Sequence, residues 1–170
     1  MKLTIKELVV FALLGALLFV GDVAMELLPN IHFVGAFLTA YTLVYRLKAL
    51  YPLTVYVFVT GLFAGFALWW IPYLYVWTVL WGAAMLLPRH LPIKVAVPLY
   101  AVVCGLHGLS FGALYAPAQV LLFHLPWESV PAWIAAGLPF DVAHAIGNLC
   151  LGVLIVPLIR LLERVERMTR

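Results

Sequence analysis

Three polar side chains interrupt an apolar stretch that reads Gly137-Leu-Pro-Phe-Asp-Val-Ala-His-Ala-Ile-Gly-Asn148. Asp141, His144 and Asn148 follow one another at spacings of three and four residues, so on a helix they share one face over two turns. Pro139 suits the first position of that helix, where its missing N–H is not needed. The stretch therefore predicts a helix that begins at Pro139, with Asp141 in its first turn and favoured there by the helix dipole.

The whole chain is strongly apolar. Of its 170 residues, 66% are hydrophobic and 10% are charged, and the mean hydropathy is +1.13. These values are typical of an integral membrane protein and exclude a soluble domain. Because ionisable side chains inside a membrane are energetically costly, the polar face of 137–148 is a candidate functional site. A purely structural polar network is the alternative for that face.

Six apolar segments predict an all-α, integral membrane six-helix bundle that forms a single transmembrane domain over residues 1–170. The expected spans are 5–28, 31–45, 50–70, 71–87, 95–115 and 139–161, with an outer loop at 116–138. All ten Lys and Arg residues lie at the N-terminus, after the second span, after the fourth span or at the C-terminus. The positive-inside rule then places both termini in the cytoplasm and predicts a multi-pass protein of the cell membrane. No cleavable signal peptide is expected, because the first apolar run is too long for one.

No motif for a cofactor, a metal ion or nucleic acid is present in the sequence. Cys104 and Cys150 both lie in apolar segments and match neither a disulfide framework nor a zinc motif. The formal charge of +3 comes from basic residues at helix ends and does not indicate nucleic-acid binding. The sequence also lacks the Gly-x-x-x-x-Gly-Lys-Ser/Thr motif, so any ATP hydrolysis must come from another chain.

The helix ends on the predicted outer side gather polar and aromatic residues. Beside the polar face of the last span, the expected substrate-binding residues are Glu26, Asn30, His32, Trp70, Tyr73 and Tyr75. An interfacial belt is the alternative for the aromatic residues. Asp22 lies one turn before Glu26 and fits a headgroup-level position as well as a site. For His107, in the fifth span, we expect a bond to a neighbouring helix rather than a site role.

Two motifs connect the chain to a known family. Ala12 and Ala16 place small residues four apart on the first span, a spacing that lets another helix pack closely. Over its whole length the chain resembles the S component, the substrate-binding membrane subunit, of energy-coupling factor (ECF) vitamin transporters. The two alanines look like the family's Ala-x-x-x-Ala motif, and Gly137-Leu-Pro-Phe-Asp-x-x-His-x-x-Gly-Asn is similar to a segment of helix six in many S components.

The resemblance implies a subunit that works with partners. It would capture a vitamin or vitamin precursor from outside, dock through Ala12 and Ala16 on a transmembrane coupling protein that carries two ATPase subunits, and topple in the bilayer to release the substrate inside. The first outer loop, here about 26–32, would act as a gate. The metal-specific members need a histidine next to the initiator methionine, and Lys2 at that position argues against nickel or cobalt transport.

Other classes of protein are the alternatives. The pieces Phe140-x-x-x-His144 and His144-x-x-x-Asn148 look like parts of the CAAX-type intramembrane protease pattern. That family also needs a Glu-Glu-x-x-x-Arg segment, and this sequence contains no Glu-Glu pair. A stand-alone small-molecule carrier and a scaffold subunit are further alternatives, which co-purification of partner chains would distinguish.

The distribution of acids indicates the charge of the substrate. The predicted outer half carries no Lys or Arg but four of the seven acids, namely Asp22, Glu26, Glu128 and Asp141. Burying an anion among them would be costly, so we expect a neutral or cationic aromatic substrate of the pyrimidine, thiazole or pyridine type over folate, biotin or pantothenate. Asp141 and Asn148 are the expected contacts to its polar edge. Backbone N–H groups at the start of the last span could hold an anion instead.

Overall fold

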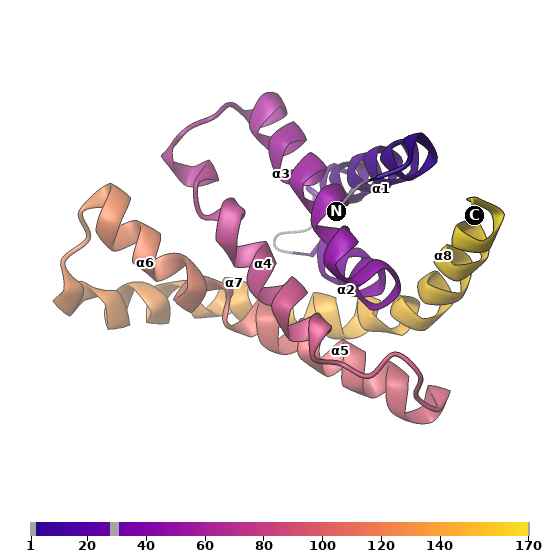
Figure 1. Ribbon diagram of the computed structural model, residues 1–170. Coiled ribbons are helices and arrows are strands. Elements are labelled where there is room, and N and C mark those ends of the chain that lie inside the picture. Colours follow the sequence, from indigo (N-terminus) through magenta and orange to yellow (C-terminus); the bar gives the residue numbers. More distant parts are fainter. Residues whose placement is uncertain (1–2, 28–30, 170) are drawn as a thin grey trace.

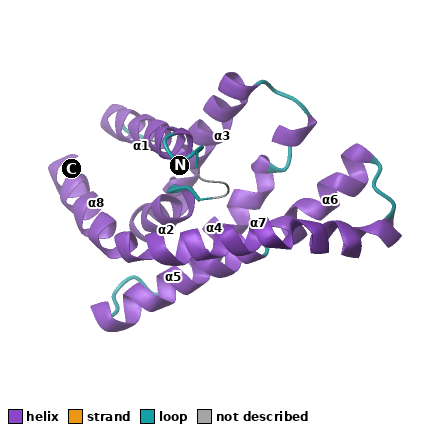
Figure 2. Ribbon diagram, turned by 180° about the vertical axis from the view of Figure 1, so that it is seen from behind, coloured by secondary structure: helices purple, strands orange, loops and turns teal. Residues whose placement is uncertain are grey.

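The computed structural model describes residues 3–27 and 31–169, and within them it contains helices and short connections but no strand (Figures 1 and 2). The predicted all-α class is therefore confirmed. Three helical runs are long and apolar enough to cross a membrane, namely Val34–Ala64, Ile93–Phe123 and Trp127–Met168. Because many large apolar side chains on these helices are exposed, the surface suits a lipid environment, as the composition predicts.

The helices follow one another with little intervening loop. Their bounds are α1 Ile5–Val23, α2 Val34–Tyr45, α3 Leu50–Ala64, α4 Tyr73–Met85, α5 Ile93–Leu109, α6 Phe111–Phe123, α7 Val130–Leu151 and α8 Ile155–Thr169. Short 3-10 turns lie between them at η1 Arg46–Ala49, η2 Leu68–Trp70, η3 Trp127–Ser129 and η4 Gly152–Leu154. The predicted spans 31–45 and 71–87 agree with α2 and α4 to within three residues at each end.

Helix α1 begins at Ile5 because Thr4 and Glu7 form a capping box. The Thr4 hydroxyl accepts a hydrogen bond from the Glu7 N–H at 3.2 Å, and the Glu7 carboxylate accepts one from the Thr4 N–H at 2.9 Å. The helix then packs along α3, where Gly15 faces Val55. The absence of a side chain at Gly15 lets the two helices approach closely.

The core forms around α2, which packs against α4 and α8 and also contacts α1 and α5. Most of its residues are buried, including Leu38, Thr39 and Tyr41. Polar side chains in this core bond locally or to the next helix. The Thr42 hydroxyl donates to the Leu38 carbonyl at 2.7 Å, for example. A helix that is apolar on all faces is expected to be buried, as α2 is.

Helices α5 and α7 pack along each other, as both ribbon views show (Figures 1 and 2). Glycines on α5 make this close contact possible. A Cβ atom at Gly105 would lie 2.8 Å from Leu149 Cγ, and one at Gly108 would lie 3.0 Å from the backbone nitrogen of Ala145. The α5–α7 contact therefore requires small residues on α5 and holds the polar face of α7 against it.

The predicted outer loop at 116–138 is wrong. Helix α6 continues to Phe123, and α7 begins at Val130, well before Pro139. Ser129 occupies the N-cap position without a capping hydrogen bond from its side chain, and Pro131 follows in the first turn, where proline is favoured. Pro139 lies inside α7, and membrane helices tolerate such a proline because neighbouring helices, side chains, ordered water or local 3-10 adjustments satisfy the freed backbone groups.

Four other predicted boundaries also differ from the structure. The helix of the span 5–28 ends at Val23. The span 50–70 ends at Ala64, because Gly65 adopts a positive φ of 88° that stops the helix. The span 95–115 is divided at Ser110 into α5 and α6. The span 139–161 is divided by η4, after which α8 continues to Thr169. Glycine and serine at the last three points explain the breaks, which hydropathy alone does not detect.

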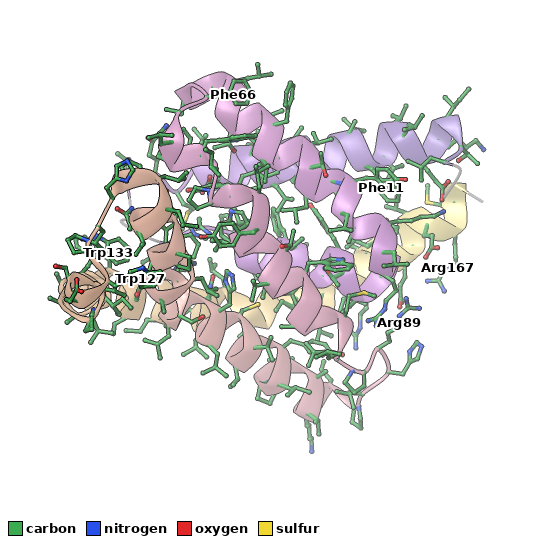
Figure 3. All side chains as sticks on the ribbon, turned by 60° about the vertical axis from the view of Figure 1, so that its left-hand side comes forward. Phe11, Phe66, Arg89, Trp127, Trp133 and Arg167 are labelled. Atoms are coloured by element: carbon green, nitrogen blue, oxygen red, sulfur yellow. The ribbon has the colours of Figure 1, made fainter. Side chains whose placement is uncertain are left out.

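Basic side chains gather at one end of the molecule. Lys48 forms an ion pair with Glu7, and the Arg46 guanidinium donates to the Met85 carbonyl, so the start of α1, the α2–α3 connection and the end of α4 lie together. In Figure 3, Arg89 and Arg167 lie on one side of the molecule, while Trp127 and Trp133 lie on the other. The basic end is therefore opposite to the end that carries Trp127 and Trp133.

Candidate functional site

A partly open cavity of about 440 Å³ lies at the end of α1 that is far from Glu7. We call it the main cavity. Its lining residues are Phe19, Asp22, Val23, Met25, Glu26, Ile31, His32, Thr60, Phe63, Ala64, Trp69, Tyr73, Trp77, Phe111 and His144. They come from α1, the segment before α2, α3, the region from η2 to α4, α6 and α7. The volume falls in the range of small-molecule sites. Aromatic residues are the most frequent in the lining, and polar and charged side chains are interspersed among them.

Aromatic and imidazole rings pack around Trp77 of α4. The Trp77 ring centroid lies 5.5 Å from that of His32, 5.5 Å from that of His107 and 5.6 Å from that of Phe111. The rings of His32 and His144 lie 4.6 Å apart, and those of Phe111 and His144 lie 5.0 Å apart. Five side chains from four helices and one connection therefore form one wall of the main cavity or support it.

Four nitrogen atoms of these five side chains have no hydrogen-bond partner in the part of the chain that the structure describes. Three belong to residues that line the main cavity, namely His32 Nδ1, Trp77 Nε1 and His144 Nε2, and the fourth is His107 Nδ1. Trp77 is 1% exposed and His144 is 3% exposed, so bulk water does not cover most of either side chain. A buried polar atom without a partner costs about 1–3 kcal/mol. Since His32, Trp77 and His144 line the main cavity, their unpartnered atoms are the candidates to bond a ligand there.

His107 bonds to a neighbouring helix, as expected from the sequence. Its Nε2 lies 3.0 Å from the Val76 carbonyl of α4, and its side chain does not line the main cavity. It supports the Trp77 ring from behind instead. Within 3–27 and 31–169, no three His, Cys, Asp or Glu side chains are grouped to hold a metal ion.

Asp22 lines the main cavity and is held by α3. Its carboxylate accepts a hydrogen bond from the Tyr56 hydroxyl at 2.9 Å, and Tyr56 is fully buried. The expected substrate contacts did not include Asp22, although its spacing of four from Glu26 was a usable signal, because the two acids share a helix face. Thr60, Trp77 and Phe111, which also line the main cavity, were not among the expected substrate contacts either.

Four of the expected substrate-binding residues do meet in space. Glu26, His32, Tyr73 and His144 all line the main cavity although they are far apart in the sequence. Asn30 lies outside the described residues, as does the middle of the predicted gate at 28–30.

Trp70 and Tyr75 were expected at the site, but they do not line the main cavity. The Trp70 indole donates to the Val57 carbonyl at 2.7 Å, and the Tyr75 hydroxyl donates to the Leu114 carbonyl at 2.9 Å. Helical geometry explains the difference. Tyr73 and Trp77 are four residues apart on one face of α4, whereas Tyr75, between them, points to the other side. The prediction that Trp70 and Tyr75 contact the substrate in the main cavity is therefore wrong.

Asp141 does not line the main cavity either. It is 6% exposed, and both of its carboxylate oxygens lie 3.1 Å from the Gly112 N–H, which donates to them at the start of α6. The Asp141 carboxylate is therefore favoured by the helix dipole of α6. The predicted position in the first turn of its own helix is wrong, because Asp141 lies in the middle of α7. A Cβ atom at Gly112 would lie 2.5 Å from Asp141 Oδ2, so glycine is needed for this contact.

Asn148, the last member of the predicted polar face, lies between three helices. Its Nδ2 donates to the Cys104 carbonyl of α5 at 3.0 Å, and it is 1% exposed. Gly35 of α2 leaves room for it, because a Cβ atom there would lie 2.7 Å from Asn148 Oδ1. Of the three polar residues on α7, only His144 lines the main cavity. Asp141 and Asn148 bond to neighbouring helices, as the alternative of a purely structural polar network predicts.

We predict that Asp141→Ala destabilises the protein and leaves the main cavity intact. The Gly112 N–H would lose both acceptors and α6 would lose its capping charge, so a loss of about 1–3 kcal/mol is expected. The midpoint of thermal unfolding in detergent measures the effect, with Asp141→Asn as the milder variant because it keeps one acceptor. An unchanged midpoint for Asp141→Ala would contradict the capping role.

The expected partner-binding residues lie on the surface of α1. Ala12 and Ala16 are both exposed, while Gly15 between them is buried against α3. Leu13, on the same surface, is 65% exposed. The two alanines therefore do not take part in packing within the chain and are free to contact lipid or another helix.

The fold and the main cavity together define a helical membrane protein with a small-molecule-sized cavity at one end. Comparison with known proteins adds no assignment, since no family model, no curated protein and no solved structure matches the chain.

Proposed function

We propose that this protein is the substrate-capture subunit, or S component, of an ECF-type importer for a vitamin or vitamin precursor. The observation that carries the proposal is the main cavity with its three unpartnered nitrogen atoms on His32, Trp77 and His144. Such a site is built to hold a polar, flat molecule. No ATPase motif is present in the sequence, so energy for transport has to come from other subunits.

The orientation that fits this function puts six spans in the cell membrane and both termini in the cytoplasm. Helices α1 to α4 would each form one span, α5 with the start of α6 a fifth and α7 the sixth. Support comes from the basic residues Arg46, Lys48 and Arg89, which lie at the end of the molecule away from the main cavity. By the positive-inside rule that end faces the cytoplasm, so the cavity opens outward.

The partner in this proposal is a transmembrane coupling protein that carries two ATPase subunits. Support comes from Ala12 and Ala16, which are exposed on α1 at the spacing that favours close helix contact. Substrate capture at the main cavity and docking through α1 would therefore use different surfaces of the same chain.

Native mass spectrometry of the protein purified from its own membrane tests the capture role. A small molecule should remain bound to the wild type, and its occupancy should fall in Trp77→Phe, which keeps a ring but removes the unpartnered N–H. His107→Ala is no control here, because its loss would disturb Trp77 itself. If gentle purification yields only the bare chain, and calorimetry with a panel of water-soluble vitamins and precursors shows no binding, the proposal is wrong.

We predict that the chain does not transport substrate alone. Vesicles that contain only this protein should bind substrate up to the amount of protein present and accumulate none, with or without ATP. Addition of the coupling protein and ATPase subunits should permit accumulation, because only they supply free energy. Accumulation above the protein concentration without these partners would show instead a stand-alone carrier.

A further inference from the structure

The main cavity contains an acid without a cation. Asp22 has Tyr56 as its hydrogen-bond partner, and no Lys, Arg or His of residues 3–27 and 31–169 forms an ion pair with it or with Glu26. None of the residues that line the cavity is Lys or Arg. A carboxylate in such apolar surroundings is poorly solvated, so a positive charge beside it is strongly favoured.

Ring faces reinforce the preference for positive charge. Trp69 and Tyr73 lie 5.7 Å apart at 89°, and Tyr73 and Trp77 lie 6.1 Å apart at 74°. Phe19 and Phe63, on α1 and α3, form a similar edge-to-face pair at 5.2 Å. All of these rings belong to residues that line the main cavity together with Asp22, and aromatic faces attract cations.

The unpartnered nitrogen atoms of the cavity lining set a second requirement for the ligand. An indole N–H can only donate, so the unpartnered Trp77 Nε1 requires an acceptor. His32 Nδ1 and His144 Nε2 can each donate or accept, depending on the tautomer. Trp77 is 1% exposed and lines the same cavity as Asp22, so this unpartnered atom is an observation independent of the acid.

We propose that the main cavity binds a heteroaromatic cation, with its positive charge beside Asp22 and a hydrogen-bond acceptor of the ligand facing Trp77 Nε1. The inference rests on the proposed capture role and narrows its substrate class. It retains the charge expected from the sequence but moves the contacts from Asp141 and Asn148 to Asp22 and Trp77. A volume of about 440 Å³ suits one or two substituted rings.

Calorimetric titration with pairs of isosteres tests the charge directly. The probes are the N-methylpyridinium-3-carboxamide cation with neutral 3-methylbenzamide, and thiamine with neutral 3-deazathiamine. Within each pair, shape is held nearly constant and only the ring charge changes. For the wild type we expect at least one cation to bind at least about tenfold more tightly than its neutral partner, as charge-assisted contacts and ring faces imply.

Variants then assign the preference to Asp22. Asp22→Asn keeps the shape and an acceptor for Tyr56 but removes the charge, so the ratio of cation to neutral affinity should fall several-fold below that of the wild type, with Glu26 and the aromatic rings retaining the remainder. The matched control is Glu128→Gln, which removes an exposed acid outside the main cavity and should leave the ratio unchanged. Tyr56→Phe keeps the carboxylate and should retain the preference, which guards against an Asp22 variant that fails to fold.

The outcomes separate this inference from the proposed function. The inference is overturned if neither cation is preferred over its neutral partner at millimolar concentration, or if Asp22→Asn keeps the full preference. It is also overturned if the molecule retained in native mass spectrometry is neutral or anionic, a result that would still support the capture role. The capture role fails only if no small molecule binds at all.

Discussion

Replacement of Gly15 by leucine is expected to prevent the chain from folding, although leucine is a better helix former than glycine. A Cβ atom at Gly15 would lie 2.5 Å from Val55 Cβ and 2.8 Å from the Pro52 carbonyl oxygen. The carbonyl belongs to the α3 backbone and cannot move aside without separating the two helices. Overpacking commonly costs 1–3 kcal/mol, and a whole leucine side chain at this contact should cost more than about 3 kcal/mol.

The neighbouring residue provides the control. Ala16→Leu adds a similar bulk one position along α1, but its side chain is exposed and meets no other helix of the chain. The yield of monodisperse protein in detergent and the midpoint of thermal unfolding measure both variants. Gly15→Leu should give little or no folded protein, and Ala16→Leu should match the wild type. Equal behaviour of the two variants would contradict the close α1–α3 contact.

If the proposed coupling protein docks on α1, introduction of tryptophan at Ala12 and Ala16 is expected to abolish that association and to leave ligand affinity unchanged. Both positions are exposed on α1, beside the face that contacts α3 through Gly15, so the isolated chain tolerates the larger rings. A partner helix packed against small residues does not tolerate them, and two indole rings would hold it away. The main cavity begins only at Phe19, beyond both substitutions.

Co-purification of the coupling protein and ATPase subunits measures docking, and calorimetry on the isolated chain measures ligand affinity. Leu106→Trp is the matched control, because Leu106 is 60% exposed on α5 and the same ring there should leave the complex intact. Retention of all partners by the double variant Ala12→Trp with Ala16→Trp would remove the docking role from this face of α1. Loss of the complex in Leu106→Trp as well would show that bulk anywhere on the surface is harmful.

Hydropathy correctly predicts those features of this protein that depend on one helix, or one helix face, alone. The apolar composition led to a helical membrane protein, and the limits of α2 and α4 followed from apolar runs ended by charged residues or proline. Gly15 is an example of a helix contact that hydropathy does not predict. The sequence pattern drew attention to the alanines on either side, but only the partner helix shows that the glycine is the buried residue of the three.

The sequence by itself determined that Asp141, His144 and Asn148 share a helix face and that Asp22, Glu26, Glu128 and Asp141 lie in segments without Lys or Arg. Those properties depend on helical periodicity and on the order of charges along the chain. Only the tertiary structure decided which of these side chains meet a cavity. Asp141 caps α6, Asn148 bonds to α5, and His144 alone joins Asp22 and Trp77. Their roles depend on unpaired backbone groups of other helices, and no local pattern records where those groups lie.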